Sequence, residues 1–395
     1  MKKTMQLKKK ILSILLSCVL TASFCGCSLE SVFQSDTSSS EIEESLAKRE
    51  KTDNPITADE QLTDREYTVY LDLVEGITDR ETPITLSIKA TRDELANAYA
   101  ALLITSAGNM LYMPREYTYN YNTETGRVID VEIKYTVSAE RAEEMNIAVR
   151  TVADEILKGI SADMSQTDIV AYFHDTIITS CEYSETANSD NVYGCLVEGK
   201  AVCEGYSRAM QYLCTLVGVK CIIVTGVAEE DHMWNMVEID GQWYHIDLTW
   251  DDPRYNPPIA DYVSHTYHNV TTEDISVDHI IDESNFTVPV ADSTAANYYV
   301  YTSRFYDSYE EALNCLPQVL KNSAENETFD ISVKFSNESA FDDTCLQLFS
   351  SENTDISEII DSANEMLSGI KISKSNLTYM TDDSFMIIKI SFELE

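Results

Sequence analysis

Apolar residues recur at helical spacing through the middle of the chain and predict three consecutive helices there. The first begins at Ser138, a candidate N-cap, and the second follows Ser165, which precedes an acid at capping-box spacing. The third starts near Cys203, carries an apolar stripe as far as Val217, and meets Gly218, a residue suited to ending a helix. We therefore expect Cys203 in the first turn of a helix.

A β-hairpin is predicted after these helices, in residues 232–250, which read HMWNMVEIDGQWYHIDLTW. Asp240-Gly241 favours a two-residue turn between the strands. That turn sets the expected pairs: Ile239 with Gln242, Met236 with His245, Trp234 with Asp247, and His232 with Thr249. Because side chains alternate across a strand, His232 and Asp247 are expected on one face as diagonal neighbours.

Both flanks of this region mix alternating and helical patterns. Between Glu66 and Val137, EYTVYLDL and ITLSIKA alternate, RDELANAYAALLI is helical, and YTYNYN and VIDVEIKYTV alternate again. Residues 297–395 predict a helix from Ser308, the strand FDISVKF, further helices, and strands at LTYM and FMIIKISFEL. The flanks therefore suggest related α+β units, in which ITLSIKA matches FDISVKF and VIDVEIKY matches MIIKISFE.

The first residues predict an export signal. Five lysines precede an apolar run, Ile11 to Phe24, that is too short to span a bilayer. The run ends in SFCGCS, which resembles a bacterial lipoprotein processing box with Cys27 as the lipidated residue; a plain secretory signal cut nearby is the alternative. Residues 27–64 are rich in serine and acids and predict a disordered tether. We expect the protein at the outer face of a bacterial membrane.

Composition narrows the classes of function. The 395 residues predict two or three domains, and 44% of them are hydrophobic, which predicts a largely folded chain. Removal of residues 1–26 leaves 23 basic and 67 acidic residues, a net charge of −44. Such a charge repels nucleic acid, so we expect no nucleic-acid partner. No EF-hand spacing, glycine-rich phosphate loop or Cys-x-x-Cys pair occurs, so we expect no cofactor and no metal site.

Seven cysteines follow Cys27, an odd number that allows a free reactive thiol, and a Cys315–Cys345 disulfide is possible. Cys203 is the candidate nucleophile, because N–H groups in the first turn of a helix favour a thiolate and can bind a developing oxyanion. His232 is the candidate base, and Asp247 can accept its ring N–H and fix its tautomer. A buried core thiol is the alternative for Cys203.

Other polar and aromatic residues are weaker candidates. His245 shares the hairpin face and is the rival base. Tyr193 can shape the site or support the oxyanion, and Trp234 can form a wall of it, although the tryptophans are expected mainly to pack the hairpin. The remaining histidines, His174, His265, His268 and His279, are expected to be structural or exposed. The acidic clusters Glu229 to Asp231 and Asp251-Asp252 are expected in solvated loops, with cation binding as the alternative.

Three segments together carry a resemblance to a known family: NVYGCLVEGKAVCEGYSRAM, HMWNMVEIDGQWYHIDLTWDDP and YHNVTTEDISVDH. They resemble the bacterial transglutaminase-like superfamily, whose core is papain-like, over roughly residues 140–285. The resemblance implies Cys203 as nucleophile, His232 as general base and acid, and Asp247 as the orienting residue. Met233 and Cys195 stand where the family commonly has alanine and a small residue.

The expected fold is α+β, with an N-terminal domain (65–137), a papain-like, transglutaminase-like catalytic domain (138–290) and a C-terminal domain (296–395). The expected activity is that of a cysteine protease, amidase or acyltransferase acting on protein or peptide amides through a thioester. The alternative is a non-catalytic cell-surface binding or assembly protein that uses the core as a scaffold. The sequence leaves the substrate, the acyl acceptor and the oligomeric state open.

Overall fold

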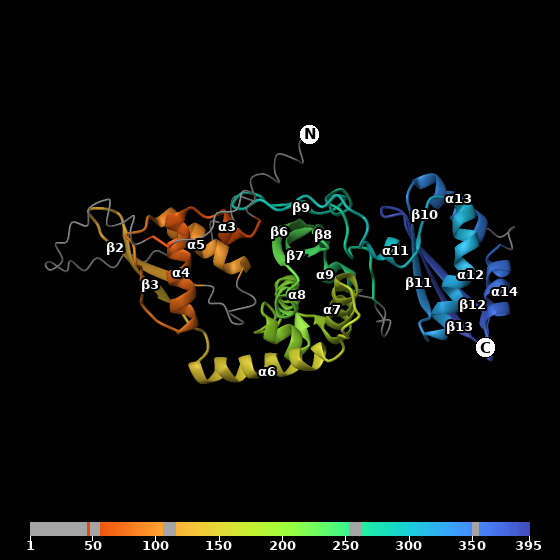
Figure 1. The fold of residues 1–395 in the computed structure, drawn as a ribbon, viewed down its shortest axis with the longest axis horizontal. Helices are drawn as coiled ribbons and strands as arrows, with labels where there is room; N and C mark the ends of the chain where they lie inside the picture. The colour runs from red at the N-terminus through yellow and green to blue at the C-terminus, as the bar shows by residue number, and fades with distance from the viewer. Residues whose placement is uncertain (1–45, 48–55, 106–115, 253–262, 350–354) are drawn as a thin grey trace. The chain divides into compact units, whose positions relative to one another are not determined.

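The computed structural model describes residues 46–47, 56–105, 116–252, 263–349 and 355–395. The export signal, Cys27 and most of the predicted tether lie outside these residues. Helices and strands both contribute, which confirms the α+β class (Figure 1). In the described part, no helix is long and apolar enough to cross a membrane. The chain divides into two compact units, one made of Met1–Val152, Asn191–Tyr193 and Glu283–Val288, and the other of Ala153–Asp190, Gly194–Asp282 and Pro289–Glu395.

The first unit has a helix where alternation predicted a strand. The stretch EYTVYLDL lies in α4 (Asp64–Thr78), whose first turn is closed by a capping box between Thr63 and Glu66. Val69, Leu73 and Ile77 are buried, four residues apart, whereas Leu71 is 37% exposed. The strand prediction was wrong because a short apolar alternation also fits a helix that buries every fourth residue.

The rest of the first unit is a small antiparallel sheet with helices. Its strands β1 (Ile84–Thr85), β2 (Tyr117–Tyr121) and β3 (Val128–Ile133) take the order β1-β3-β2. Buried residues of α4, α5 (Arg92–Thr105) and the sheet form one core. A short helix, α3 (Ala58–Gln61), falls inside the segment predicted as tether, because Ala58 and Leu62 pack against Ala101.

The C-terminal flank follows the sequence prediction closely. Its helix α12 begins after Ser308, whose hydroxyl accepts the N–H of Glu311. The sheet order is β10-β11-β13-β12. The elements of this flank are α11 (Tyr298–Tyr301), β10 (Phe305–Tyr306), α12 (Tyr309–Glu325), β11 (Asp330–Phe335), α13 (Glu338–Phe349), α14 (Asp355–Met366), β12 (Ile372–Asp382) and β13 (Ile387–Leu394).

The two flanks have the same order of elements: helix, strand, helix, strand, strand. The order β1-β3-β2 corresponds to β11-β13-β12. In each flank the last strand, β3 or β13, is antiparallel to both of its neighbours. The C-terminal flank adds α14 and the strand β10, which runs parallel to β11. The likeness inferred from short strand sequences therefore extends to the topology.

The middle region contains the three predicted helices and a four-stranded antiparallel sheet of order β8-β7-β6-β9. The helices α6 and α7 begin after Ser138 and Ser165, which cap them as predicted, and α8 packs against β6 and β7. The elements are α6 (Ala139–Leu157), α7 (Gln166–Ser180), β4 (Glu182–Tyr183), the π-helical turn η1 (Gly194–Glu198), β5 (Lys200–Ala201), α8 (Cys203–Val217), β6 (Cys221–Ala228), β7 (Glu230–Ile239), β8 (Gln242–Ile246), α9 (Leu248–Asp251), α10 (Thr272–Ile275) and β9 (Ile280–Ile281).

The hairpin register is confirmed near its turn and differs further away. Asp240 and Gly241 both have positive φ, 51° and 78°, as the two-residue turn requires. Ile239 pairs with Gln242, and Met236 pairs with His245. The expected pairs Trp234–Asp247 and His232–Thr249 do not form, because β8 ends at Ile246 and the chain turns into α9.

Candidate active site

Cys203 is the first residue of α8 and is partly exposed. The N–H of Val202, just before it, donates to the carbonyl oxygen of Ser189 at 2.9 Å. That carbonyl also lies so close to Gly205 that a Cβ there would approach it to 2.3 Å, so only glycine fits without a shift. These contacts fix the first turn of α8, and Gly218 ends the helix in a left-handed conformation as predicted.

Cys203 and His232 both line a pocket of about 290 Å³. Three consecutive exposed acids of this lining, Glu229, Glu230 and Asp231, form its acidic rim. Its lining residues are Tyr183, Cys203, Ala228, Glu229, Glu230, Asp231, His232, Thr249, Trp250 and Asp252.

His232 is 7% exposed, and its Nε2 lies 2.6 Å from Oδ2 of Asp247. Burial by itself lowers the pKa of this imidazole, but the Asp247 carboxylate and the Cys203 thiol together raise the pKa of His232 to about 10. The ring is therefore an imidazolium at neutral pH. Because Nε2 is held by Asp247, Nδ1 is the ring nitrogen left for the thiol.

Asp247 is buried and has hydrogen-bond partners at both carboxylate oxygens. Its Oδ1 accepts the backbone N–H groups of Thr249 (2.9 Å) and Trp250 (3.2 Å), so the residue is also the N-cap of α9. Burial raises the pKa of this carboxyl, but the imidazoles of His232 and His279 together outweigh burial, and the pKa of Asp247 lies well below its usual range. Asp247 is thus a fixed negative charge beside His232. Its position is set by its role as the cap of α9, not by pairing with β7 as the sequence predicted.

His279 is a member of this arrangement that the sequence did not single out. Its Nε2 lies 3.0 Å from Oδ2 of Asp247, and its Nδ1 lies 2.6 Å from Oδ1 of Asp278. It is 2% exposed. The available signal was its place at the end of the segment YHNVTTEDISVDH. His232, Asp247 and His279 also have the composition of a metal-ligand group, with their ligand atoms within 4.8 Å of one another.

His245, the rival base, is held as a neutral ring. The indole Nε1–H of Trp234 donates to its Nδ1 at 3.0 Å, so its Nε2 carries the proton and faces the Thr272 hydroxyl at 3.2 Å. Burial lowers the pKa of His245 to about 3. A ring with both nitrogens engaged and a strongly lowered pKa is poorly suited to take protons from a thiol at neutral pH.

The aromatic candidates occupy different positions. Trp234 is fully buried and stacks on His232, with ring centroids 5.9 Å apart and planes at 19°. Trp250 lines the pocket, with its ring centroid 6.2 Å from that of His232. Tyr193 belongs to the first compact unit, where its hydroxyl accepts a hydrogen bond from Arg141 at 3.2 Å. The suggested role of Tyr193 in oxyanion support stays a prediction.

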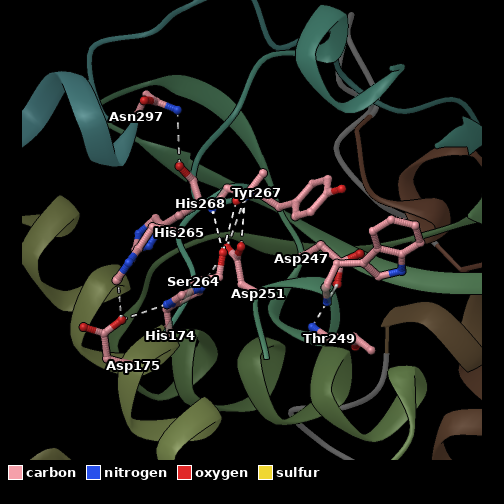
Figure 2. A network of polar contacts seen from close by, with 12 residues as sticks. His174, Asp175, Asp247, Thr249, Asp251, Ser264, His265, Tyr267, His268 and Asn297 are labelled. Carbon is pink, nitrogen blue, oxygen red and sulfur yellow. Dashed lines mark hydrogen bonds and ion pairs between the residues drawn. The ribbon is translucent and has the colours of Figure 1, made fainter. Parts of the chain in front are cut away.

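The acidic clusters divide between solvent and interior. Asp252 accepts a hydrogen bond from the Tyr206 hydroxyl at 2.5 Å. Asp251 is 0% exposed, so the expectation of a solvated loop was wrong for this residue. Its carboxylate accepts the N–H of Tyr267 and contacts Nε2 of His174 at 3.1 Å. Asp251 therefore ties α9 to α7 (Figure 2).

The histidines expected to be structural or exposed are all buried, namely His174, His265, His268 and His279. The seven cysteines in the described residues are free thiols, so the possible Cys315–Cys345 disulfide is not formed in the structure.

Residues 150–248 match the family model of the transglutaminase-like superfamily. The chain therefore carries a domain of this superfamily of cysteine enzymes, as its motifs indicated, and the matched range contains Cys203, His232 and Asp247. Both flanking units lie largely outside the match.

The chain is similar to known proteins either over a short segment or at low sequence identity. Human kyphoscoliosis peptidase is 34% identical over 64 residues, which cover 13% of this chain and 10% of that protein, and the mouse protein is 33% identical over the same span. The match thus spans about a tenth of these relatives. Among solved structures, a TGase is 17% identical with a TM-score of 0.27, covering 36% of this chain and 46% of that one. A protein of Cytophaga hutchinsonii proposed to be a cysteine protease is 14% identical with a TM-score of 0.25, covering 42% and 51%. These scores are too low to bear on function.

Proposed function

We propose that this chain is a thiol enzyme acting on amide bonds of proteins or peptides, with Cys203 as nucleophile, His232 as general acid and base, and Asp247 as the orienting residue. One observation carries the proposal: Cys203 and His232 line the same pocket, and His232 contacts the buried carboxylate of Asp247. The matched superfamily supports the same class of chemistry.

The chemistry runs in two halves that use the same residues. The Cys203 sulfur attacks the amide carbonyl carbon, and the N–H groups of the first turn of α8 stabilise negative charge on the carbonyl oxygen. His232 gives its proton to the departing nitrogen, the C–N bond breaks, and a thioester remains. Water or an amine then attacks the thioester, His232 takes the proton of the attacker, and the Cys203 sulfur leaves.

The acidic rim favours a substrate with positive charge beside the reacting amide. Glu229, Glu230 and Asp231 line the same pocket as Cys203. Carboxylates around a narrow pocket attract cationic groups and repel anionic ones. We therefore propose peptides with lysine or arginine near the reacting amide, or amine acceptors in the second half-reaction.

We also propose that the enzyme is exported and held at the outer face of a bacterial membrane through a lipid on Cys27. The support is the sequence alone: a basic start, a short apolar run and a lipoprotein-like box. A Cys27→Ala variant released into the medium, with wild type retained in the membrane fraction, is the expected result. Equal release of both proteins contradicts the anchor.

Selective alkylation tests the nucleophile. With limiting iodoacetamide near pH 7, mass mapping should find Cys203 labelled at least about tenfold faster than any other thiol, because His232 and the helix N-terminus stabilise charge on its sulfur. Cys345 is the internal control, since it is also partly exposed while burial raises the pKa of Cys345 to about 11. The advantage of Cys203 should disappear in His232→Ala.

Mass spectrometry of peptides tests the reaction. Glutamine-containing and lysine-flanked peptides incubated with wild type should show cleavage, loss of ammonia or isopeptide formation, each with its own mass change, and Cys203→Ala should show none.

If Cys203 reacts no faster than Cys345 in the alkylation experiment, the enzyme proposal fails, and the non-catalytic binding or assembly protein becomes the better account.

A further inference from the structure

A second polar cluster gathers around Asp175 of α7, and the proposed chemistry does not use it. We propose that His174, Asp175, His265 and His268 form a binding site for one divalent transition-metal ion, best suited to Zn²⁺. Each residue offers a ligand atom, and these atoms lie within 4.8 Å of one another. The sequence predicted no metal site, because two of these residues come from a part of the chain far from the other two.

Two elements supply the ligands. His174 and Asp175 are adjacent on α7, and His265 and His268 lie three residues apart in the segment before α10. Oδ1 of Asp175 is 2.8 Å from Nδ1 of His174 and 3.0 Å from Nε2 of His265, so both imidazoles point at one carboxylate (Figure 2). The Asp175 side chain is 48% exposed, which leaves an entry path for an ion.

His268 supplies the independent sign of a missing ligand. The residue is 1% exposed, and within the part of the chain that the structure describes its buried Nδ1 has no hydrogen-bond partner. A buried polar nitrogen without a partner is costly and uncommon in folded proteins.

The surroundings hold the ligands in place. Nε2 of His174 contacts the fully buried carboxylate of Asp251, the arrangement that commonly orients a metal-binding histidine. Asp251 is itself fixed by the N–H of Tyr267. The ring of His265 stacks on Tyr298, with centroids 3.6 Å apart and planes at 9°.

Ligand type selects the ion. Imidazole nitrogens suit zinc, copper and nickel, whereas calcium and magnesium require mainly oxygen ligands. Three imidazoles and one carboxylate can complete a four-coordinate zinc site. Both nitrogens of His174 face carboxylates, so binding displaces the Nδ1 proton of His174 to solvent.

The ion would brace the active site rather than take part in it. Asp251 is the last residue of α9, and its N–H donates to the carbonyl oxygen of Asp247 at 3.1 Å. A metal on His174 therefore fastens α7 to the helical turn that presents Asp247 to His232.

Zinc titration of the chelator-stripped, full-length protein tests the site. A Cys203→Ala background without a polyhistidine tag removes the thiol as a competing ligand. Calorimetry and elemental analysis should give one zinc per chain, and zinc at a hundred times its Kd should raise Tm by about 5–10 °C. Asp175→Asn and His268→Gln should each weaken zinc binding at least about tenfold.

His232→Gln is the matched control, because His232 belongs to the other group of metal-ligand composition and should keep full zinc affinity. Of the two cluster variants, Asp175→Asn should disturb folding least, because the Asp175 side chain is half exposed to solvent. Absence of zinc binding at micromolar concentration, or binding unchanged in both cluster variants, overturns the proposal. Loss of binding in His232→Gln places the ion at His232, Asp247 and His279 and overturns it equally. None of these outcomes depends on the amide chemistry.

Discussion

Replacement of Asp247 by asparagine tests the electrostatic account of the site most directly. The substitution keeps the size and the Oδ1 acceptor of the α9 cap, but it exchanges the charged Oδ2 facing His232 and His279 for an N–H donor. His232 then loses the negative charge that holds its proton. Because burial alone lowers the pKa of His232, the ring should become neutral at pH 7.

The stability cost can be worked from the pKa of His232. A rise from 6.5 to about 10 corresponds to about 4 kcal/mol of folding free energy at pH 7. The usual cost of breaking a buried ion pair, about 3–5 kcal/mol, gives the same range. We therefore expect Asp247→Asn to lower the free energy of unfolding by about 3–4 kcal/mol at pH 7.

The pH dependence has a definite sign. A raised histidine pKa stabilises the fold fully below 6.5, and this stabilisation is lost as the pH rises toward 10. The lowered pKa of Asp247 stabilises the fold above about 4, the ordinary pKa of an aspartate, and this contribution is lost as the pH falls further toward the lowered pKa. The difference between wild type and Asp247→Asn should thus be largest between about pH 4 and 6.5 and should shrink by pH 9–10.

Urea unfolding followed by tryptophan fluorescence measures this difference, since all three tryptophans lie in residues 234–250 and report on the core. Peptide turnover should fall by at least about 100-fold in the same variant, and Cys203 should lose its advantage over the other thiols in alkylation. Asp251→Asn is the matched control: it removes an equally buried carboxylate of α9 that contacts His174 instead of His232, so stability should fall while Cys203 keeps most of its reactivity. A stability loss below about 1 kcal/mol, or one that does not change between pH 6 and 9, refutes the reasoning.

Three further predictions follow from burial and charge. Leu73→Ala should cost about 2–4 kcal/mol of unfolding free energy and Leu71→Ala under about 1 kcal/mol, because α4 buries the first and exposes the second; equal costs in urea titrations would favour a strand. In wild type, protonation of His245 in the unfolded chain lowers the free energy of unfolding as the pH falls from 6.5 to 4, because the pKa of His245 in the folded protein is only about 3. His245→Gln should remove about 3 kcal/mol of this loss. An unchanged fall in the free energy of unfolding over this pH range contradicts the prediction. Combined Glu230→Gln and Asp231→Asn should raise KM for lysine-flanked peptides several-fold and leave KM for glutamate-flanked peptides equal or lower; a uniform change in steady-state assays argues against charge selection.

Local signals in the sequence were sufficient where a short range of residues fixes the structure. Ser165 and its capping partner start α7, Gly218 ends α8, and Asp240-Gly241 forms the hairpin turn. The same local reasoning failed for α4, where alternation and helical spacing coincide over eight residues. The burial of Val69, Leu73 and Ile77 against the rest of the first unit decided between the two.

The candidate site shows the same division. The sequence by itself determined that Cys203 starts a helix and that His232 and Asp247 are near neighbours, because a helix start and a two-residue turn depend on adjacent residues. Only the tertiary structure decided that Asp247 reaches His232 as a helix cap, and that His279 shares its carboxylate. It also decided that His174 meets His265 and His268. The contacts of His279 and of His174 join segments tens of residues apart, and their formation depends on how helices and sheet pack, which no local pattern of residues specifies.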